Sequence, residues 1–273
     1  MNLNRAFDEA TSNILTPASR QVEKGMLEND TLTATISTNG FEKLDLKPGP
    51  NSRVVFQSDQ PGIATEQYRL LRKSLTDQFP EGAVVIVTSP TKGDGKTVNA
   101  ANLAWCFAET AAPTLLLEAD LRQPNVAQML GFRPHQGVEA VMAGEVRPES
   151  AVAVTSNNGF LLHVAAVSKP QRDPIRLLKN PATKNLLEWA RSRFFWVLLD
   201  CPPIVPAVDV MELTRWTDAV LLVVRVRSTP VDLVRKSFQM LGDQVKGVIL
   251  NEATLCQDSY YHYLSGYNTA KQR

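Results

Sequence analysis

The sequence predicts an α/β fold: a doubly wound, mostly parallel sheet with helices on both faces. Two observations predict it. Short, continuous apolar runs alternate along the chain with segments of helical period, which is typical of a parallel sheet buried on both sides. With 273 residues and 44% hydrophobic content, the chain is also long enough to build a full core for one large domain with an appended arm.

The chain divides into three predicted parts. Residues 1–58 are rich in Thr, Asn, Ser and Pro and poor in apolar periodicity, so they predict a flexible N-terminal arm or linker. A docking segment for a partner is the alternative for this part. Residues 59–257 contain the periodic segments and form the predicted domain, and residues 258–273 form a tyrosine-rich tail.

The composition argues against several functions. Lys+Arg 29 against Asp+Glu 28 gives a net charge of +1, so no bulk electrostatic attraction to nucleic acid is expected. The three cysteines are far apart and have no metal-ligand spacing, which fits unpaired thiols in a reducing cytosol. No apolar run approaches the roughly 18 residues of a membrane span. These features indicate a cytoplasmic protein.

The first helix is expected from Ala64 to Leu75. Its apolar face carries Tyr68, Leu71 and Leu75, and three charged residues at three-residue spacing, Glu66, Arg69 and Arg72, form a ridge on another face. The ridge is either a solvated helix face with local ion pairs or a contact between subunits.

The next element, residues 84–104, has the form of a strand, a loop and a helix that begins at about Lys96. Gly93 and Gly95 allow successive backbone N–H groups to turn inward and bind an anion at the helix N-terminus. Lys96 would bridge the β- and γ-phosphates, and Thr97 would ligate Mg²⁺. The loop departs from the pattern G-x-x-x-x-G-K-[ST] only at Pro90, where the first glycine is expected.

This motif predicts a P-loop NTPase that uses ATP and Mg²⁺. The predicted ATP-binding residues lie in or beside the loop: Ser89, Lys92, Gly93, Asp94, Gly95, Lys96, Thr97 and Val98.

Two later strands are expected to end in carboxylates at the same edge of the sheet. The strand from Thr114 ends at Glu118 and Asp120, and the strand from Phe194 ends at Asp200. Ligands bind at the carboxyl ends of parallel strands, so these groups should face the nucleotide phosphates. Asp200, after a hydrophobic strand, has the position of a Mg²⁺ and water-positioning aspartate.

The remaining domain elements are predicted from apolar runs and breaks. Residues 125–192 read as helices around one short strand at 160–165, and two strands follow at 218–225 and 246–251. A helix at 231–241 lies between these two strands.

The tail contains four of the five tyrosines, Tyr260, Tyr261, Tyr263 and Tyr267, in a segment with no helical period. They either pack on a neighbouring surface or are accessible phenols meant for phosphorylation. Each phosphate would add a charge of roughly −1.5 to −2.

Over residues 60–273 these motifs together resemble the bacterial tyrosine kinase family, the autokinases of capsule and exopolysaccharide assembly. The family's ATP loop, Ser-x-x-x-Gly-x-Gly-Lys-[Ser/Thr], matches Ser89 to Thr97. Its second motif, apolar-Asp-x-Asp-x-Arg, matches Leu115 to Arg122 except that Glu118 replaces an aspartate. The family's Walker B strand, which is followed by Asp-x-Pro-Pro, matches Val197 to Pro203. Its oligomerisation motif, Glu-x-x-Arg-x-x-Arg, matches Glu66, Arg69 and Arg72, and the tyrosine-rich tail completes the set.

The resemblance implies an ATP-dependent tyrosine autokinase that regulates exopolysaccharide polymerisation and export. Neighbours in a ring-like homo-oligomer would phosphorylate one another's tails in trans. A transmembrane chain-length regulator would activate the kinase and hold it at the inner face of the plasma membrane, and a tyrosine phosphatase would oppose it.

The resemblance also implies roles for single residues. Lys96, Glu118, Asp120 and Asp200 would be catalytic, with Thr97, Asp120 and Asp200 around Mg²⁺. Glu118 would assist deprotonation of the incoming tyrosine or hold a metal-bound water. Asn251, by analogy with related ATPases, would contact adenine.

Two alternatives stay open. A regulatory or positioning ATPase shares this fold, but it places a second lysine where this chain has Thr91, and Lys92 is displaced by one residue. A nucleotide-binding scaffold with weakened catalysis is kept open by Glu118 and Pro90. Retained ATP binding without turnover would identify the scaffold.

Overall fold

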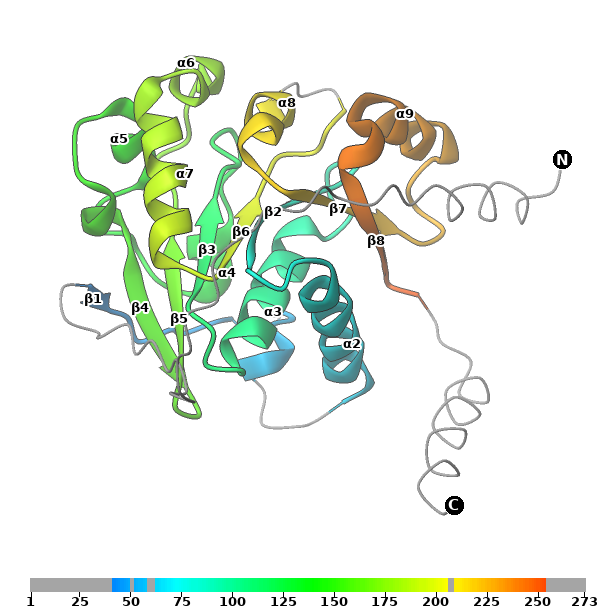
Figure 1. Ribbon diagram of the computed structural model, residues 1–273, viewed down its shortest axis with the longest axis horizontal. Helices are drawn as coiled ribbons and strands as arrows, with labels where there is room; N and C mark the ends of the chain where they lie inside the picture. The colour runs from blue at the N-terminus through cyan, green and yellow to red at the C-terminus, as the bar shows by residue number, and fades with distance from the viewer. Residues whose placement is uncertain (1–40, 50–51, 58–61, 206–208, 254–273) are drawn as a thin grey trace, which may run out of the picture. The chain divides into compact units, whose positions relative to one another are not determined.

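The computed structural model describes residues 41–49, 52–57, 62–205 and 209–253 (Figure 1). The strands in this part are β1 (Glu42–Lys43), β2 (Ala83–Thr88), β3 (Thr114–Glu118), β4 (Ala153–Asn157), β5 (Phe160–Ala165), β6 (Trp196–Asp200), β7 (Ala219–Arg225) and β8 (Val245–Asn251). The α-helices are α2 (Ile63–Gln78), α3 (Lys96–Ala108), α4 (Val126–Leu130), α5 (Val138–Ala143), α6 (Pro174–Leu178), α7 (Pro181–Arg193), α8 (Asp209–Leu213) and α9 (Val231–Leu241).

The described strands form one sheet in the order β1-β4-β5-β3-β6-β2-β7-β8. Every neighbouring pair is parallel except β4 and β5, which are antiparallel. The strand that leads into the glycine-rich loop, β2, lies between β6 and β7. This arrangement confirms the predicted doubly wound, mostly parallel sheet.

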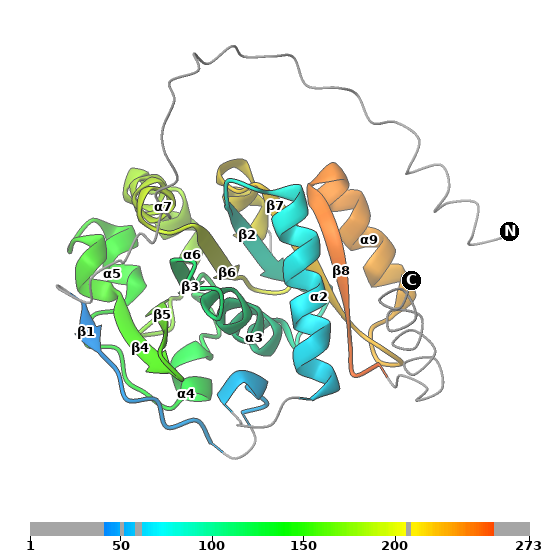
Figure 2. The ribbon, with the colours of Figure 1, turned by 60° about the horizontal axis from the view of Figure 1, so that its bottom comes forward.

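Successive residues of the central strands enter two different cores because side chains alternate across a strand. In β2, Val84 and Ile86 pack with residues of α5 to α9, whereas Val85 and Val87 pack with residues of α2, α3 and α4. Figure 2 shows α2 and α3 together on one side of the sheet. A strand buried on both faces has to be apolar throughout, which is why its continuous apolar run predicted it.

The sequence interpretation missed strand β4. Residues 125–192 were expected to contain one strand, but β4 and β5 form a hairpin joined by Asn158 and Gly159, whose φ angles are 49° and 83°. Asn-Gly is the pair that favours a two-residue hairpin turn, because both positions require positive φ. The turn signal was therefore present, but the run Ala153–Asn157 is too short and too polar to predict a strand by itself.

Part of the segment expected to be a flexible arm packs on the domain. β1 pairs with β4, and Val54 and Phe56 are buried beside α2 and α3. The domain boundary at residue 58 stays a prediction, and residues 1–40 and the tail 258–273 lie outside the described residues. None of the helices in the described part combines the length and apolar character that a membrane span requires.

A buried histidine in β5 gives the fold a predicted sensitivity to acid. His163 is 2% exposed, and its ring lies between Phe41 and Phe194, with centroid distances of 5.1 and 5.0 Å. Burial lowers the pKa of His163 to about 4. The folded protein therefore binds this proton less readily than the unfolded chain, and the stability contributed by neutral His163 is lost as pH falls from about 6.5 through 4.

We expect wild type to lose about 2 kcal/mol relative to His163→Leu when the pH is lowered from 8 to 5. The measurement is urea unfolding of both proteins at both pH values. Other titrating groups are common to the two proteins and cancel in the comparison. An identical pH dependence of the two unfolding free energies would show that His163 does not titrate in this way.

Candidate nucleotide site

A cleft of about 1060 Å³ opens where β2, β3 and β6 end. Parallel strands place their carboxyl ends at one edge of the sheet, so residues far apart in sequence meet there. The lining residues are Lys92, Gly93, Gly95, Lys96, Thr97, Val98, Asp120, Arg122, Gln123, Pro124, Asn125, Pro170, Pro202, Pro203 and Val205.

The glycine-rich loop forms one wall of this cleft. Gly93 and Gly95 have φ angles of 89° and 98°, a region that favours glycine, and Gly95 directly precedes α3. The free N–H groups of the first turn of α3 therefore open toward an anion at this end of the helix. Ser89 is buried at the start of the loop and donates its hydroxyl to the carbonyl of Thr91 (2.7 Å).

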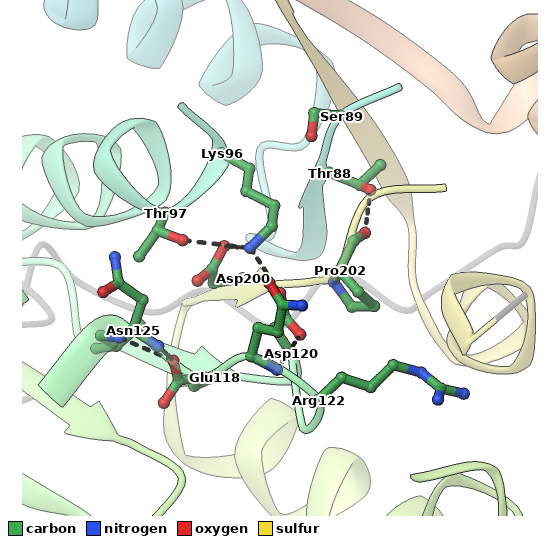
Figure 3. Close-up of polar contacts among 12 residues, drawn as sticks. Thr88, Ser89, Lys96, Thr97, Glu118, Asp120, Arg122, Asn125, Asp200 and Pro202 are labelled. Carbon is green, nitrogen blue, oxygen red and sulfur yellow. Dashed lines mark hydrogen bonds and ion pairs between the residues drawn. The ribbon is translucent and has the colours of Figure 1, made fainter. Parts of the chain in front are cut away.

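Lys96 reaches across the cleft to the carboxylates predicted from the later strands (Figure 3). Its Nζ lies 2.8 Å from Asp120 Oδ2, 3.7 Å from Asp200 Oδ1 and 3.3 Å from Thr97 Oγ1. Burial disfavours the ammonium form, but the carboxylates of Asp200 and Asp120 outweigh burial and raise the pKa of Lys96. A fixed positive charge therefore stands beside the loop amides.

Asp200 has the chemistry of a cation ligand. Both carboxylate oxygens are buried and have no hydrogen-bond partner among the residues that the structure describes, and the Lys96 ammonium is the nearby counter-charge. Burial raises the pKa of Asp200, while Lys96 opposes that shift. An unpartnered carboxylate beside the Thr97 hydroxyl and Asp120 fits a hard cation such as Mg²⁺. The described residues offer no group of three acidic, His or Cys ligands, so phosphate oxygens and water would complete the coordination.

Glu118 uses both of its oxygens on the backbone. Oε1 accepts from the N–H groups of Asn125 (2.5 Å) and Val126 (2.8 Å), and Oε2 accepts from Val167 (2.9 Å). Burial, with a contribution from Asp200, raises the pKa of Glu118 to about 7. The carboxylate thus joins two segments that line the cleft nearby, through Asn125 and Pro170. Its predicted role toward tyrosine stays a prediction.

Asp94, which belongs to the loop, and Asn251 are not among the residues that line the cleft. Asp94 is 2% exposed, and its carboxylate accepts from Thr91 and from Thr229. The side-chain amide of Asn251 donates to the carbonyl of Asp94 (2.8 Å). The predicted contact of Asn251 with adenine is untested.

Two polar residues of the cleft were not among the site residues predicted from the sequence, although Arg122 ends a motif that the sequence matches. Arg122 lines the cleft and forms a bidentate ion pair with Asp209, at 2.7 and 3.1 Å, at the start of α8. Gln123 follows and donates its backbone N–H to Asp120 (3.0 Å). Their position immediately after the acidic end of a strand could have indicated that they lie at the cleft.

The charged ridge of α2 contacts α3 within the same chain. Arg69 pairs with Glu66 at 2.5 Å and with Glu109 at 2.9 Å, and Arg72 lies 3.5 Å from Glu109. Arg72 also donates to the carbonyl of Cys106 (2.5 Å). No sequence pattern indicated Glu109, because its pairing depends on how the two helices pack. The ridge's role in self-association stays a prediction.

The tyrosines of the tail lie outside the described residues. The remaining tyrosine, Tyr68, donates its hydroxyl to Asn99 (2.9 Å), and burial raises its pKa to about 12.

Comparison with known proteins shows what this chain is similar to. The family model described as an AAA domain matches residues 83–236. The succinoglycan biosynthesis transport protein ExoP of Rhizobium meliloti is 30% identical over 81% of this chain, and the tyrosine-protein kinase wzc of Salmonella typhi is 31% identical over 80%. The matches cover 29% and 31% of those proteins, so the chain corresponds to less than a third of their length.

A shorter relative and two solved structures are also similar to this chain. The tyrosine-protein kinase YwqD of Bacillus subtilis is 27% identical over 77% of this chain and 90% of its own length. The VpsO kinase domain has a TM-score of 0.63 and 27% identity, covering 70% of this chain and 96% of that domain. The kinase domain of Escherichia coli tyrosine kinase ETK, at 24% identity, has a TM-score of 0.66, covering 74% of this chain and 82% of that chain.

Proposed function

Because this chain belongs to the bacterial tyrosine kinases, within the AAA-domain family whose model it matches, we propose that it transfers the γ-phosphoryl group of ATP to tyrosine. The observation that carries the proposal is the position of Lys96. Its ammonium group lies between the glycine-rich loop and two buried aspartates, on a cleft large enough for a nucleotide. The names of the relatives, which are tyrosine-protein kinases, support tyrosine as the acceptor of the phosphoryl group.

The residues of the cleft suit phosphoryl transfer, which depends mainly on positioning and on charge stabilisation. Bound ATP would supply the phosphoryl group, and Mg²⁺ held by Thr97, Asp120 and Asp200 would neutralise phosphate charge. Lys96 and the loop N–H groups stabilise negative charge on the transferred group, and they are already in place before reaction. The proposed role of Asp120 and Asp200 is therefore to bind Mg²⁺.

The proposed acceptors are Tyr260, Tyr261, Tyr263 and Tyr267 in the tail of a neighbouring subunit. The test is phosphopeptide mass spectrometry on the full chain after incubation with Mg-ATP, compared with a variant in which all four are phenylalanine. We expect phosphate on the tail of wild type and none in the variant. A bare wild-type tail in protein expressed beside its membrane activator, with ATP still bound by the protein, would contradict the kinase function.

We further propose that the subunits associate through Glu66, Arg69 and Arg72. Since Glu109 already pairs with both arginines, a neighbour's acidic group would have to compete with it. Charge reversal, Arg69→Glu with Arg72→Glu, should convert the assembly to monomers in sedimentation velocity. Lys73→Glu on the same helix, where the lysine side chain is 74% exposed, is the control. If the double variant assembles like wild type, the ridge is an intrachain contact and does not join subunits.

The proposed setting is exopolysaccharide or capsule assembly, supported by the name of ExoP as a succinoglycan biosynthesis transport protein. We propose a transmembrane chain-length regulator as activator, which would hold this chain at the inner face of the plasma membrane, and a tyrosine phosphatase as its opponent.

A nucleotide-binding scaffold with weakened catalysis is the second candidate. The geometry of Glu118 favours it, since both carboxylate oxygens are engaged by the backbone. Mg-ATP binding without tyrosine phosphorylation or ATP hydrolysis would identify this function.

A further inference from the structure

The glycine-rich loop is hydrogen-bonded, through the side chain of Asp94, to a residue that comes far later in the chain. Thr229 follows β7, and its hydroxyl donates to Asp94 Oδ1 (2.8 Å) while accepting from the N–H of Arg225 (2.9 Å). Asp94 is not among the cleft-lining residues, although Gly93 and Gly95 on either side of it are. The carboxylate therefore points away from the place where phosphates would lie.

The same carboxylate closes the loop on itself. Its oxygens accept from the backbone N–H of Thr91 (2.9 Å) and from the Thr91 hydroxyl (3.0 Å). In the part of the chain that the structure describes, the Asp94 carboxylate thus has three donor groups, two from its own loop and one from Thr229. A carboxylate this close to a phosphate site would repel the ligand if it turned toward it, so its orientation matters for anion binding.

The backbone carbonyl of Asp94 is hydrogen-bonded as well, and this bond orients an N–H group of the loop. The carbonyl of Asp94 accepts from the side-chain amide of Asn251 at the end of β8. In a trans peptide unit the C=O and the following N–H point in opposite directions. Fixing that carbonyl toward Asn251 therefore directs the N–H of Gly95 the other way, toward the cleft that Gly95 lines.

We propose that Thr229 is a positioning residue for the nucleotide, which acts through Asp94 to keep the loop N–H groups directed at the phosphates. The inference rests on the proposed function only in that the ligand is a nucleotide, and it does not require tyrosine as the acceptor. Thr229 touches neither the cleft nor the reacting atoms.

The test uses the full chain and Mg-ADP as the probe, with the dissociation constant measured by calorimetry. Thr229→Val keeps the shape of the side chain but removes the hydroxyl, and we expect the dissociation constant to rise about tenfold, as for a lost hydrogen bond to a charged group. Thr229→Ser restores the hydroxyl and should bind within about twofold of wild type. Thr217→Val, at the opposite end of β7, is the matched control and should also bind like wild type.

Two further measurements distinguish a positioning role of Thr229 from a general loss of structure. In tyrosine phosphorylation, Thr229→Val should raise the KM for ATP about as much as the dissociation constant, with kcat within about twofold, because Lys96, Asp120 and Asp200 are untouched. In an Asp94→Ala background the Thr229→Val change should have little further effect, since the hydroxyl acts through that carboxylate.

The proposal is overturned if Thr229→Val binds Mg-ADP like wild type, if Thr229→Ser binds as weakly as Thr229→Val, or if the loss is undiminished in the Asp94→Ala background. It is also overturned, together with the proposed function, if wild type does not bind Mg-ADP. A wild type that binds Mg-ADP and shows the Thr229 effect, but does not phosphorylate tyrosine, supports this inference while contradicting the kinase function.

Discussion

Replacing Lys96 with alanine is expected to abolish phosphoryl transfer to tyrosine. The ammonium group is the positive charge placed between the loop and the two aspartates, 2.8 Å from Asp120 and 3.7 Å from Asp200. Its removal takes away charge stabilisation of the transferred group and leaves two buried carboxylates facing the phosphates. We expect the rate of labelling by radioactive ATP to fall by a factor on the order of 10³ or more.

Folding has to be monitored in the same experiment, because breaking a buried ion pair can destabilise a protein by about 3–5 kcal/mol. Lys96→Met fills more of the vacated space, and a thermal melt of each variant shows whether it is folded. Lys184→Ala on α7, where the lysine pairs with Glu188 on the same helix and its ammonium lies over the Trp216 ring, is the control and should label like wild type. Labelling at the wild-type rate by a folded Lys96 variant would remove Lys96 from the site.

Replacing Glu118 with glutamine is expected to loosen the cleft. An amide can still accept from Asn125 and Val126 through its oxygen, but its NH₂ group then faces the N–H of Val167, which loses its acceptor. One unsatisfied buried N–H costs about 1–3 kcal/mol of stability. We expect the unfolding free energy to fall by that amount and the dissociation constant of Mg-ADP to rise, because Asn125 and Pro170 line the cleft.

The same variant distinguishes this backbone role from the catalytic role that the sequence predicted. If Glu118 assists deprotonation of tyrosine, kcat should fall by about 10²–10⁴ while Mg-ADP affinity and stability are retained. If it positions the two backbone segments, affinity and stability should fall and kcat at saturating ATP should change less than about tenfold. Glu118→Asp, one methylene shorter, should resemble the glutamine variant in the second case.

Much of the fold was predictable because β2 and its neighbours are buried on both faces. That burial requires continuous apolar runs, which mark the strands, and the loop after β2 carries its own glycine and lysine signature. The proposed metal ligands Asp120 and Asp200 were predicted by the same logic, since they lie at the carboxyl ends of such runs. β4 could not be predicted in this way, because its short, partly polar run is stabilised by pairing with β5.

The contacts that no sequence pattern indicated are those between residues distant in the chain. Glu109 pairs with Arg69 because α2 packs on α3, and Thr229 reaches Asp94 because β7 ends beside the loop. The position of the Glu118 carboxylate depends likewise on the path of the chain at Val167. Each depends on tertiary packing, which local spacing does not encode.

The strand order has a consequence for how this protein is made. Val87 of β2 pairs with Asp200 of β6 and with Leu221 of β7, both of which leave the ribosome long after it. At about 5–20 residues per second, β2 waits on the order of ten seconds for its first neighbour. During that time Ala83–Thr88, an uncharged β-branched segment, has neither edge paired and is open to aggregation. The nascent chain should therefore depend on chaperones until β6 has been synthesised, and nucleotide cannot stabilise it before then.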